Sequence, residues 1–214
     1  MENIFGLFIL NLRREIRQWA QLLGLILLAW VVAYLVYRTS PSNGVDVFNF
    51  VYWIFVLLIS INATMRVESH DSEEERIFLY TLTDPFDTLM AKLIFNFVYI
   101  SLIAILFYLA VLLFFAPVVV FSISYILLLL SGALVIAACM TLVTAIGFAS
   151  GGQTTLVSIL GLPLLIPAIL ILNKIGKTIL QNDEIVMVDV YSLIGIIMIS
   201  ISASLFLYPV VWKQ

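Results

Sequence analysis

Six long runs of apolar residues follow one another along this chain, and short polar segments separate them. The runs cover residues 22–37, 47–65, 93–116, 123–149, 154–172 and 190–211. A helix needs about 20 apolar residues to cross the hydrocarbon core of a bilayer, since each residue rises about 1.5 Å. Strands of a membrane barrel alternate apolar and polar residues, whereas these runs are continuous. The pattern therefore predicts an all-α integral membrane protein with six transmembrane helices.

The first 21 residues show a different pattern, in which apolar side chains recur every three or four positions. The apolar set is Phe5, Phe8, Ile9, Leu12, Ile16 and Trp19, and the polar set opposite it is Asn11, Arg14, Arg17 and Gln18. This spacing predicts an amphipathic helix along the cytoplasmic membrane interface. The alternative is a helix that extends the first span into the cytosol, and burial of Phe5, Phe8 and Trp19 distinguishes the two. We thus expect an interfacial helix over residues 1–21, followed by a six-helix domain over residues 22–214.

Composition and charge agree with a membrane protein and give it an orientation. Hydrophobic residues make up 64% of the 214 residues and charged residues only 11%, whereas a soluble domain carries about 25%. Seven Lys and Arg residues flank the spans on the side of the N-terminus, and three lie on the other side: Arg13, Arg14, Arg17, Arg66, Arg76, Lys92 and Lys213 against Arg38, Lys174 and Lys177. The positive-inside rule then predicts that both termini are cytoplasmic.

The largest predicted cytoplasmic loop runs from residue 66 to residue 92 and is strongly acidic. It holds seven of the thirteen acidic residues, and a short apolar stretch precedes Asp84 and Pro85. Pro85 suits the first turn of a helix, with Asp84 as its cap. Charge beside an apolar stretch favours docking onto another protein, while a simple solvated loop is the alternative. The residues that we expect to make this contact are Glu68, Asp71, Glu74, Glu75, Asp84 and Pro85.

Two further features concern how the predicted spans pack. Small residues recur every four positions in the fourth run, at Ala133, Ala137, Thr141 and Ala145. Small side chains let membrane helices approach closely, so this face is expected to meet another helix. In the fifth run, Pro163 and Pro167 each remove a backbone donor, which predicts a kink. Kinked helices occur in rigid bundles and in moving transporters, so motion stays open.

Reactive chemistry is scarce in this sequence. The six runs contain no Asp, Glu, Lys, Arg or His, which argues against an intramembrane protease or a proton-relay transporter. His70 is the single histidine and has no metal-binding spacing around it. Gly176, Lys177 and Thr178 imitate the end of a phosphate-binding loop, but Ile171 stands where the motif needs glycine. We therefore expect a non-catalytic subunit, with any ATP hydrolysis in a separate subunit.

Residues 151–171 read GGQTTLVSILGLPLLIPAILI, a glycine turn that leads into a proline-containing span. Together with the helix around residues 11–19, the loop that ends in Ala91 and Lys92, and the six spans, this stretch resembles the CcmB-type permease family, the haem exporter protein B of cytochrome c maturation. The resemblance implies an ABC-2-like permease in the bacterial inner membrane. It also implies a hetero-oligomer with a cytoplasmic ABC ATPase and a haem-handling membrane subunit. The loop lacks the family's clear glycine before the coupling segment, which leaves the docking residues open.

The resemblance places ATP and haem in the partner subunits. Haem ligation usually needs His, Met or Cys near an open site. We expect neither haem nor a metal nor any other cofactor on this chain, and no nucleic-acid partner; the remaining partner is membrane lipid.

Three functions follow from these observations. The first is a permease subunit that couples ATP hydrolysis in its partner to haem delivery or to release of the haem chaperone. The second is a non-transporting scaffold that holds a haem-handling complex together. The third is a stand-alone channel or secondary transporter, which needs polar groups along a midplane path. Only scattered candidates for such a path exist, namely Asn62, Thr141, Thr144, Ser200, Ser202 and Ser204.

Overall fold

A computed structural model shows an all-helical protein over the residues that it describes. These are residues 2–17, 23–24, 27–28, 30–32, 34–35, 38, 44–69, 83–115, 122–149, 154–181, 183 and 186–211. The long helices are α1 (Glu2–Arg17), α3 (Gly44–Ser69), α5 (Pro85–Phe115), α6 (Ile123–Ala149), α7 (Thr154–Gln181) and α8 (Met187–Val211). The described positions between residues 23 and 38 are helical as well.

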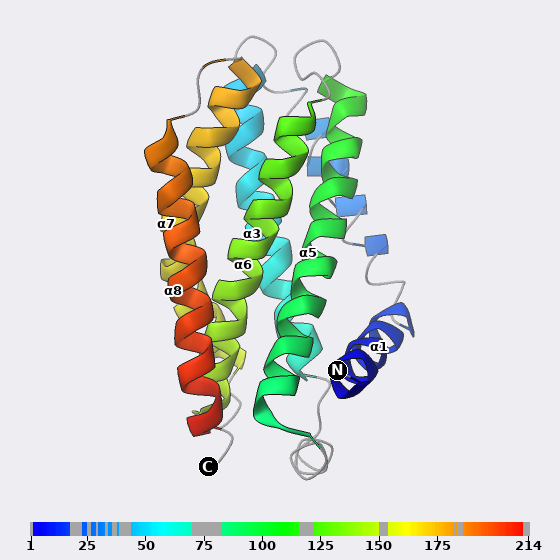
Figure 1. The fold of residues 1–214 in the computed structure, drawn as a ribbon. Helices are drawn as coiled ribbons and strands as arrows, with labels where there is room; N and C mark the ends of the chain where they lie inside the picture. The colour runs from blue at the N-terminus through cyan, green and yellow to red at the C-terminus, as the bar shows by residue number, and fades with distance from the viewer. Residues whose placement is uncertain are drawn as a thin grey trace.

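Helices α3, α5, α6, α7 and α8 form an up-and-down bundle (Figure 1). Successive helices run in opposite directions, so α5 begins at the end of the bundle where α3, α6 and α8 finish. Helix α6 is the central one, with 72% of its apolar stretch buried, whereas only 17% of the apolar stretch of α8 is buried. Helix α1 lies outside the bundle, beside α5, and runs at a steep angle to it (Figure 1).

Four helices of the described chain are long and apolar enough to cross a membrane. Their apolar stretches are Pro85–Leu113, Ile123–Thr144, Ile159–Gln181 and Met187–Tyr208. In α3, the described apolar part covers Val47–Asn62. The first predicted span falls mainly outside the described residues. The fold is therefore typical of a multi-pass membrane protein, and four of the six predicted spans are present as long apolar helices.

The helix boundaries differ from the predicted spans mostly by extension. Helix α3 continues to Ser69, so Glu68 lies in its last turn. Helix α5 begins at Pro85, which leaves residues 70–84 as the connection between α3 and α5. Helix α7 continues to Gln181, nine residues beyond the predicted span. The physical reason is that charged side chains mark where a helix leaves the lipid, and the helix itself can continue beyond that point.

Local hydrogen bonds explain where several helices begin and end. The Asp84 carbonyl accepts a hydrogen bond from the Thr88 amide at 3.1 Å, which places Asp84 at the N-cap of α5 as predicted. Ser122 holds the same position before α6, where its carbonyl accepts from the Ile126 amide at 3.2 Å. At the end of α7, the Asp183 amide donates to the Thr178 carbonyl at 3.0 Å. Such bonds satisfy backbone groups that helix ends leave unpaired.

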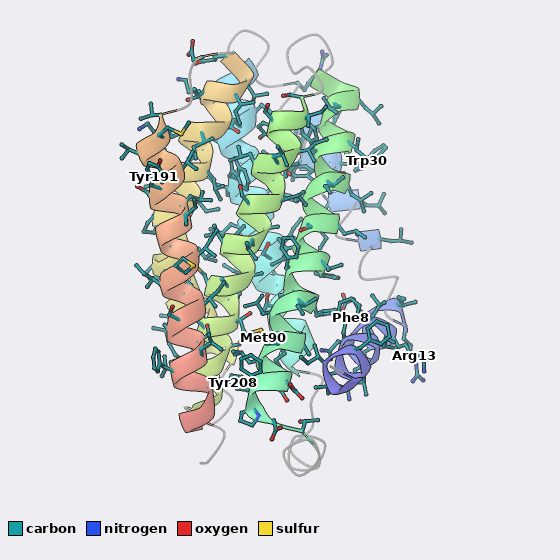
Figure 2. The ribbon with its side chains drawn as sticks, in the orientation of Figure 1. Phe8, Arg13, Trp30, Met90, Tyr191 and Tyr208 are labelled. Carbon is teal, nitrogen blue, oxygen red and sulfur yellow. The ribbon has the colours of Figure 1, made fainter. Side chains whose placement is uncertain are left out.

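Apolar side chains cover the outer surface of α7 and α8. On α8, Tyr191, Met198, Ile199 and Phe206 are all more than 60% exposed, and Figure 2 shows Tyr191 directed away from the bundle. At the other end of α8, Tyr208 is buried and packs with Leu89 and Met90 of α5. A water-soluble protein rarely exposes so many large apolar side chains together, so this surface suits contact with lipid.

Candidate functional site

A buried cluster of amide and hydroxyl groups joins α3, α6 and α7 near the end of the bundle where α5 finishes. Its centre is Asn49, which is completely buried. The Asn49 Nδ2 group donates to the backbone carbonyl of Asn173 at 2.6 Å and to Asn173 Oδ1 at 2.8 Å. The Tyr125 hydroxyl donates to Asn49 Oδ1 at 2.9 Å. We call Asn49, Tyr125 and Asn173 the polar hub; it satisfies both donors and one acceptor position of the Asn49 amide.

Aromatic rings surround the polar hub. Tyr52 stacks on Phe107 with ring centroids 5.1 Å apart, and Tyr108 stacks on Tyr125 at 4.9 Å. Trp53 stands perpendicular to Tyr52, with their centroids 5.5 Å apart. We call these five residues the aromatic layer. Offset stacking and edge contacts each contribute about 0.5–1.5 kcal/mol beyond area burial, so the layer adds to the stability of this end of the bundle.

One residue of the aromatic layer also bonds the backbone of α5. The Tyr52 hydroxyl donates to the Ala104 carbonyl at 2.7 Å, and both residues are buried. The indole Nε1 of Trp53 is buried and has no hydrogen-bond partner within the described part of the chain. Through Tyr52 and Asn49, α3 is therefore hydrogen-bonded to α5, α6 and α7 at nearly the same depth.

Two glycines make room for the α3 side chains. A Cβ atom at Gly132 of α6 would lie 2.5 Å from Cη2 and 2.6 Å from Cζ3 of Trp53. A Cβ atom at Gly176 of α7 would collide with the amide group of Asn49. Asn49 and Trp53 are one turn apart on α3, so each of these side chains occupies the space beside one glycine of a neighbouring helix. A larger residue at either glycine would therefore force the side chain of Asn49 or Trp53, or α3 itself, to shift.

Further polar contacts join α6 to α5 and α8 nearer the middle of the bundle. The Asn96 Nδ2 group donates to Thr141 Oγ1 at 3.4 Å. The thiol of Cys139, which is the single cysteine of the sequence, lies 3.3 Å from the Ser200 hydroxyl. At the end near the polar hub, Lys174 forms an ion pair with Asp189 at 2.8 Å, linking α7 to α8.

Helix α1 meets the bundle through α5. The Tyr99 hydroxyl donates to Glu15 Oε1 at 2.6 Å, and only 6% of Glu15 is exposed. One side of α1 also packs through Phe8, whose ring meets Phe95 edge to face at a centroid distance of 6.2 Å. Figure 2 shows Phe8 on the side of α1 that faces α5. We call these four residues the α1–α5 contact.

The described members of the predicted coupling set lie at the end where α5 begins. Asp84 is exposed, Pro85 is the first residue of α5, and Glu68 is in the last turn of α3. Asp71, Glu74 and Glu75 lie outside the described residues. The Thr83 and Thr88 hydroxyls are 3.1 Å apart and close the turn that leads into α5.

The residues predicted for packing and kinking all lie in helices. Ala133, Ala137 and Thr141 are buried on α6, while the side chain of Ala145 is outside the described set. Pro163 and Pro167 are inside α7, which continues through both, and both side chains are exposed. Of the polar candidates, Asn62 bonds back to the Leu58 carbonyl of its own helix.

The polar hub was not predicted from the sequence. Its cue was the presence of Asn49 inside an apolar run, since polar residues within membrane helices usually hydrogen-bond a neighbouring helix. Gly176 was read only as an imperfect phosphate-binding motif, whereas it makes room for Asn49.

This arrangement can hold helices together, and its side chains offer hydrogen bonds and ring contacts. No group of three His, Cys, Asp or Glu residues able to hold a metal ion occurs in the parts of the chain that the structure describes. The chain matches no protein-family model, no curated protein and no solved structure. The resemblance to CcmB-type permeases therefore remains a prediction from the sequence.

Proposed function

We propose that this chain is the membrane-spanning permease subunit of an ABC-type complex, driven by a separate cytoplasmic ATPase. The observation that carries this proposal is the course of α5. It begins at Pro85, directly after the acidic connection, and continues without a break to Phe115. Along this course, the Ala104 carbonyl of α5 accepts a hydrogen bond from the Tyr52 hydroxyl of α3, and the Phe107 ring of α5 stacks on the Tyr52 ring. A displacement of the connection would thus act through a single continuous helix on the end of the bundle that holds the polar hub and the aromatic layer.

The acidic connection is also linked to the polar hub and the aromatic layer through α3, the helix that precedes it. Helix α3 ends at Ser69, just before the connection, and it carries Asn49 and Trp53 near its start. Both helices that enter the connection are therefore joined to each other and to α6 and α7 by the polar hub and the aromatic layer. A partner that moves residues 70–84 would act on α3 and α5 together.

The process that we propose is cytochrome c maturation, on the strength of the sequence resemblance. In that setting, ATP is hydrolysed in the partner ATPase, and haem is held by a haem-handling membrane subunit. The role of this chain is to convert nucleotide-driven movement into haem delivery or release of the haem chaperone.

A second candidate function is the static assembly scaffold, and one observation favours it. Tyr52, Trp53 and Tyr125 are completely buried, and the polar hub pairs its amide groups closely. A tightly packed, hydrogen-bonded cluster resists rearrangement. The scaffold and the permease therefore differ in whether the bundle moves during the ATPase cycle.

Copurification tests the proposed partner. The protein is extracted from its native membrane in mild detergent, and the proteins that accompany it are identified. We expect an ATPase with a phosphate-binding loop, and we expect Glu74→Lys with Glu75→Lys to reduce its recovery. Asp183→Lys is the matched control, because Asp183 is exposed at the opposite end of the bundle. Unchanged recovery of the ATPase with the Glu74 and Glu75 variant would refute the docking assignment.

The single cysteine distinguishes the permease from the scaffold. Cys139 is buried in α6 beside Ser200 of α8, so a small maleimide reacts with it only when these helices separate. Its labelling rate in the purified complex is measured by peptide mass spectrometry without nucleotide, with ATP, and with a trapped hydrolysis state. A permease predicts a rate that depends on nucleotide, whereas a scaffold predicts one constant rate.

A further inference from the structure

Helix α1 presents three differently composed faces, and only one of them meets the bundle. The face with Glu15 and Phe8 contacts α5. The next face is apolar and exposed, with 65% of Phe5, 38% of Leu12 and 60% of Ile16 accessible. These three residues recur at intervals of seven and four, so they share one side of the helix.

The third face of α1 is cationic. Arg13 and Arg17 are both exposed and lie one turn apart, next to the apolar face. Figure 2 shows Arg13 directed away from the bundle, on the side opposite to Phe8. The apolar and cationic faces adjoin, which is the arrangement of a helix that lies in the headgroup region of a bilayer.

The depth of the α1–α5 contact fits this position. Lys92 is the last charged residue of α5, and only uncharged residues follow it up to Phe115. Phe95 and Tyr99 lie three and seven residues further along, which is about 5 and 10 Å at 1.5 Å per residue. Interfacial helices bury their apolar face about 5–10 Å into the boundary between headgroups and acyl chains. Contacts with α5 therefore hold α1 at the depth where Phe5, Leu12 and Ile16 reach acyl chains and arginines reach phosphates.

We propose that Arg13 and Arg17 form a binding surface for anionic phospholipid headgroups of the bilayer in which the chain lies. Guanidinium groups bind phosphate through paired, charge-assisted hydrogen bonds. Zwitterionic headgroups also carry a phosphate, but their net charge is zero, so they do not attract the arginines electrostatically as anionic headgroups do. Two arginines on adjacent turns can reach neighbouring headgroups while the apolar face stays in the acyl region. The evidence for this surface does not rest on the proposed transport function, because it comes from α1 and involves neither the acidic connection nor an ATPase.

Hydrogen exchange of the full-length protein in nanodiscs tests the proposal. The two lipids compared are palmitoyl-oleoyl phosphatidylglycerol and palmitoyl-oleoyl phosphatidylcholine. Each basic residue near an anionic surface contributes a factor of about five, so detachment of α1 should be about thirtyfold rarer in phosphatidylglycerol. The α1 amides should exchange more slowly by the same factor, and 1 M salt should remove the difference.

Variants assign the effect to the two arginines. Arg13→Gln with Arg17→Gln should exchange its α1 amides equally fast in both lipids, whereas Arg13→Lys with Arg17→Lys should keep most of the difference. Arg38→Gln with Lys177→Gln is the matched control, since it also removes two positive charges, and it should behave like the unmodified protein. Amides of α5 and α6 in the same spectra report whether each variant is folded.

Three results would overturn the proposal. The first is equal exchange of the α1 amides of the unmodified protein in the two lipids, a comparison that needs no variant. The second is an undiminished lipid difference in the folded glutamine variant. The third is protection of α1 that appears only when a copurified protein is present, since that protein would then be its partner.

Discussion

Replacement of Gly132 by alanine should destabilise the bundle, because the ring of Trp53 occupies the space that the new methyl group needs. The Cβ atom would lie 2.5 Å from Cη2 of Trp53. Carbon atoms pack at about 3.5–4.0 Å, so the ring or α3 as a whole must retreat by about 1 Å. Trp53 is fully buried and in contact with Tyr52, so little free space is available for this movement. Overpacking of this kind costs about 1–3 kcal/mol.

Gly195→Ala in α8 is the matched control. It is the same substitution in a helix of the same bundle, but no atom lies within 4 Å of the new Cβ. Both variants gain the helix preference of alanine, about 1 kcal/mol at most, so this gain cancels in the comparison. The difference between the two variants therefore isolates the collision with Trp53, and we expect Gly132→Ala to be less stable by about 1–3 kcal/mol.

The assay is reversible unfolding in mixed micelles, followed by far-UV circular dichroism as the denaturing detergent increases. Trp53→Phe removes the ring atoms nearest to Gly132, and the indole Nε1 that it deletes has no described partner. In the Trp53→Phe background, Gly132→Ala should lower the free energy of unfolding by at least about 1 kcal/mol less than it does in the unmodified protein. Residues in contact show such an interaction energy in double-mutant cycles. Equal stability of the Gly132 and Gly195 variants, or additive effects with Trp53→Phe, would refute this account of α3 packing.

Three further predictions concern hydrogen bonds and charges of the same bundle. Tyr125→Phe removes the donor to Asn49 and should lower the free energy of unfolding by about 1–2 kcal/mol in the same assay; no loss would contradict the polar hub. Lys174→Ala breaks the ion pair with Asp189, and because Lys174 is 61% exposed the loss should stay below about 1 kcal/mol and shrink in 1 M salt. Glu15→Ala and Tyr99→Phe should each speed hydrogen exchange of α1, and their combination should add little, since both remove the same hydrogen bond. Fully additive acceleration would show that the two side chains act separately.

Sequence patterns predicted a long helix well where polar or turn-forming residues flank the apolar run at both ends. The fourth run was predicted as residues 123–149, and α6 has these bounds, because Ser122 caps its start and glycines follow its end. The fifth run was ended too early, at residue 172. The polar residues beyond it continue α7, and one of them, Asn173, turns inward to meet Asn49.

The candidate site was much harder to predict than the helices. Asn49 and Asn173 are 124 residues apart, and no local periodicity links two positions on different helices. The hydrophobicity of a run shows that it is buried in lipid or protein, but it does not distinguish the two. Only the packing of whole helices decides that Asn49 is completely buried while Asn62 of the same helix is exposed.

The position of α5 joins the proposed function to the proposed lipid contact. Tyr99 bonds α1, and Tyr108 stacks within the aromatic layer, nine residues or about two and a half turns further along. Two and a half turns bring the two tyrosines to opposite faces of α5, so α1 and the aromatic layer hold this helix from opposite sides and at different depths. A push on Pro85 by an ATPase would tilt α5 only if one of these contacts yields. Under our proposals the α1–α5 contact is the one that yields, because α1 lies outside the bundle, and the charge of the surrounding lipid then sets how easily α5 moves.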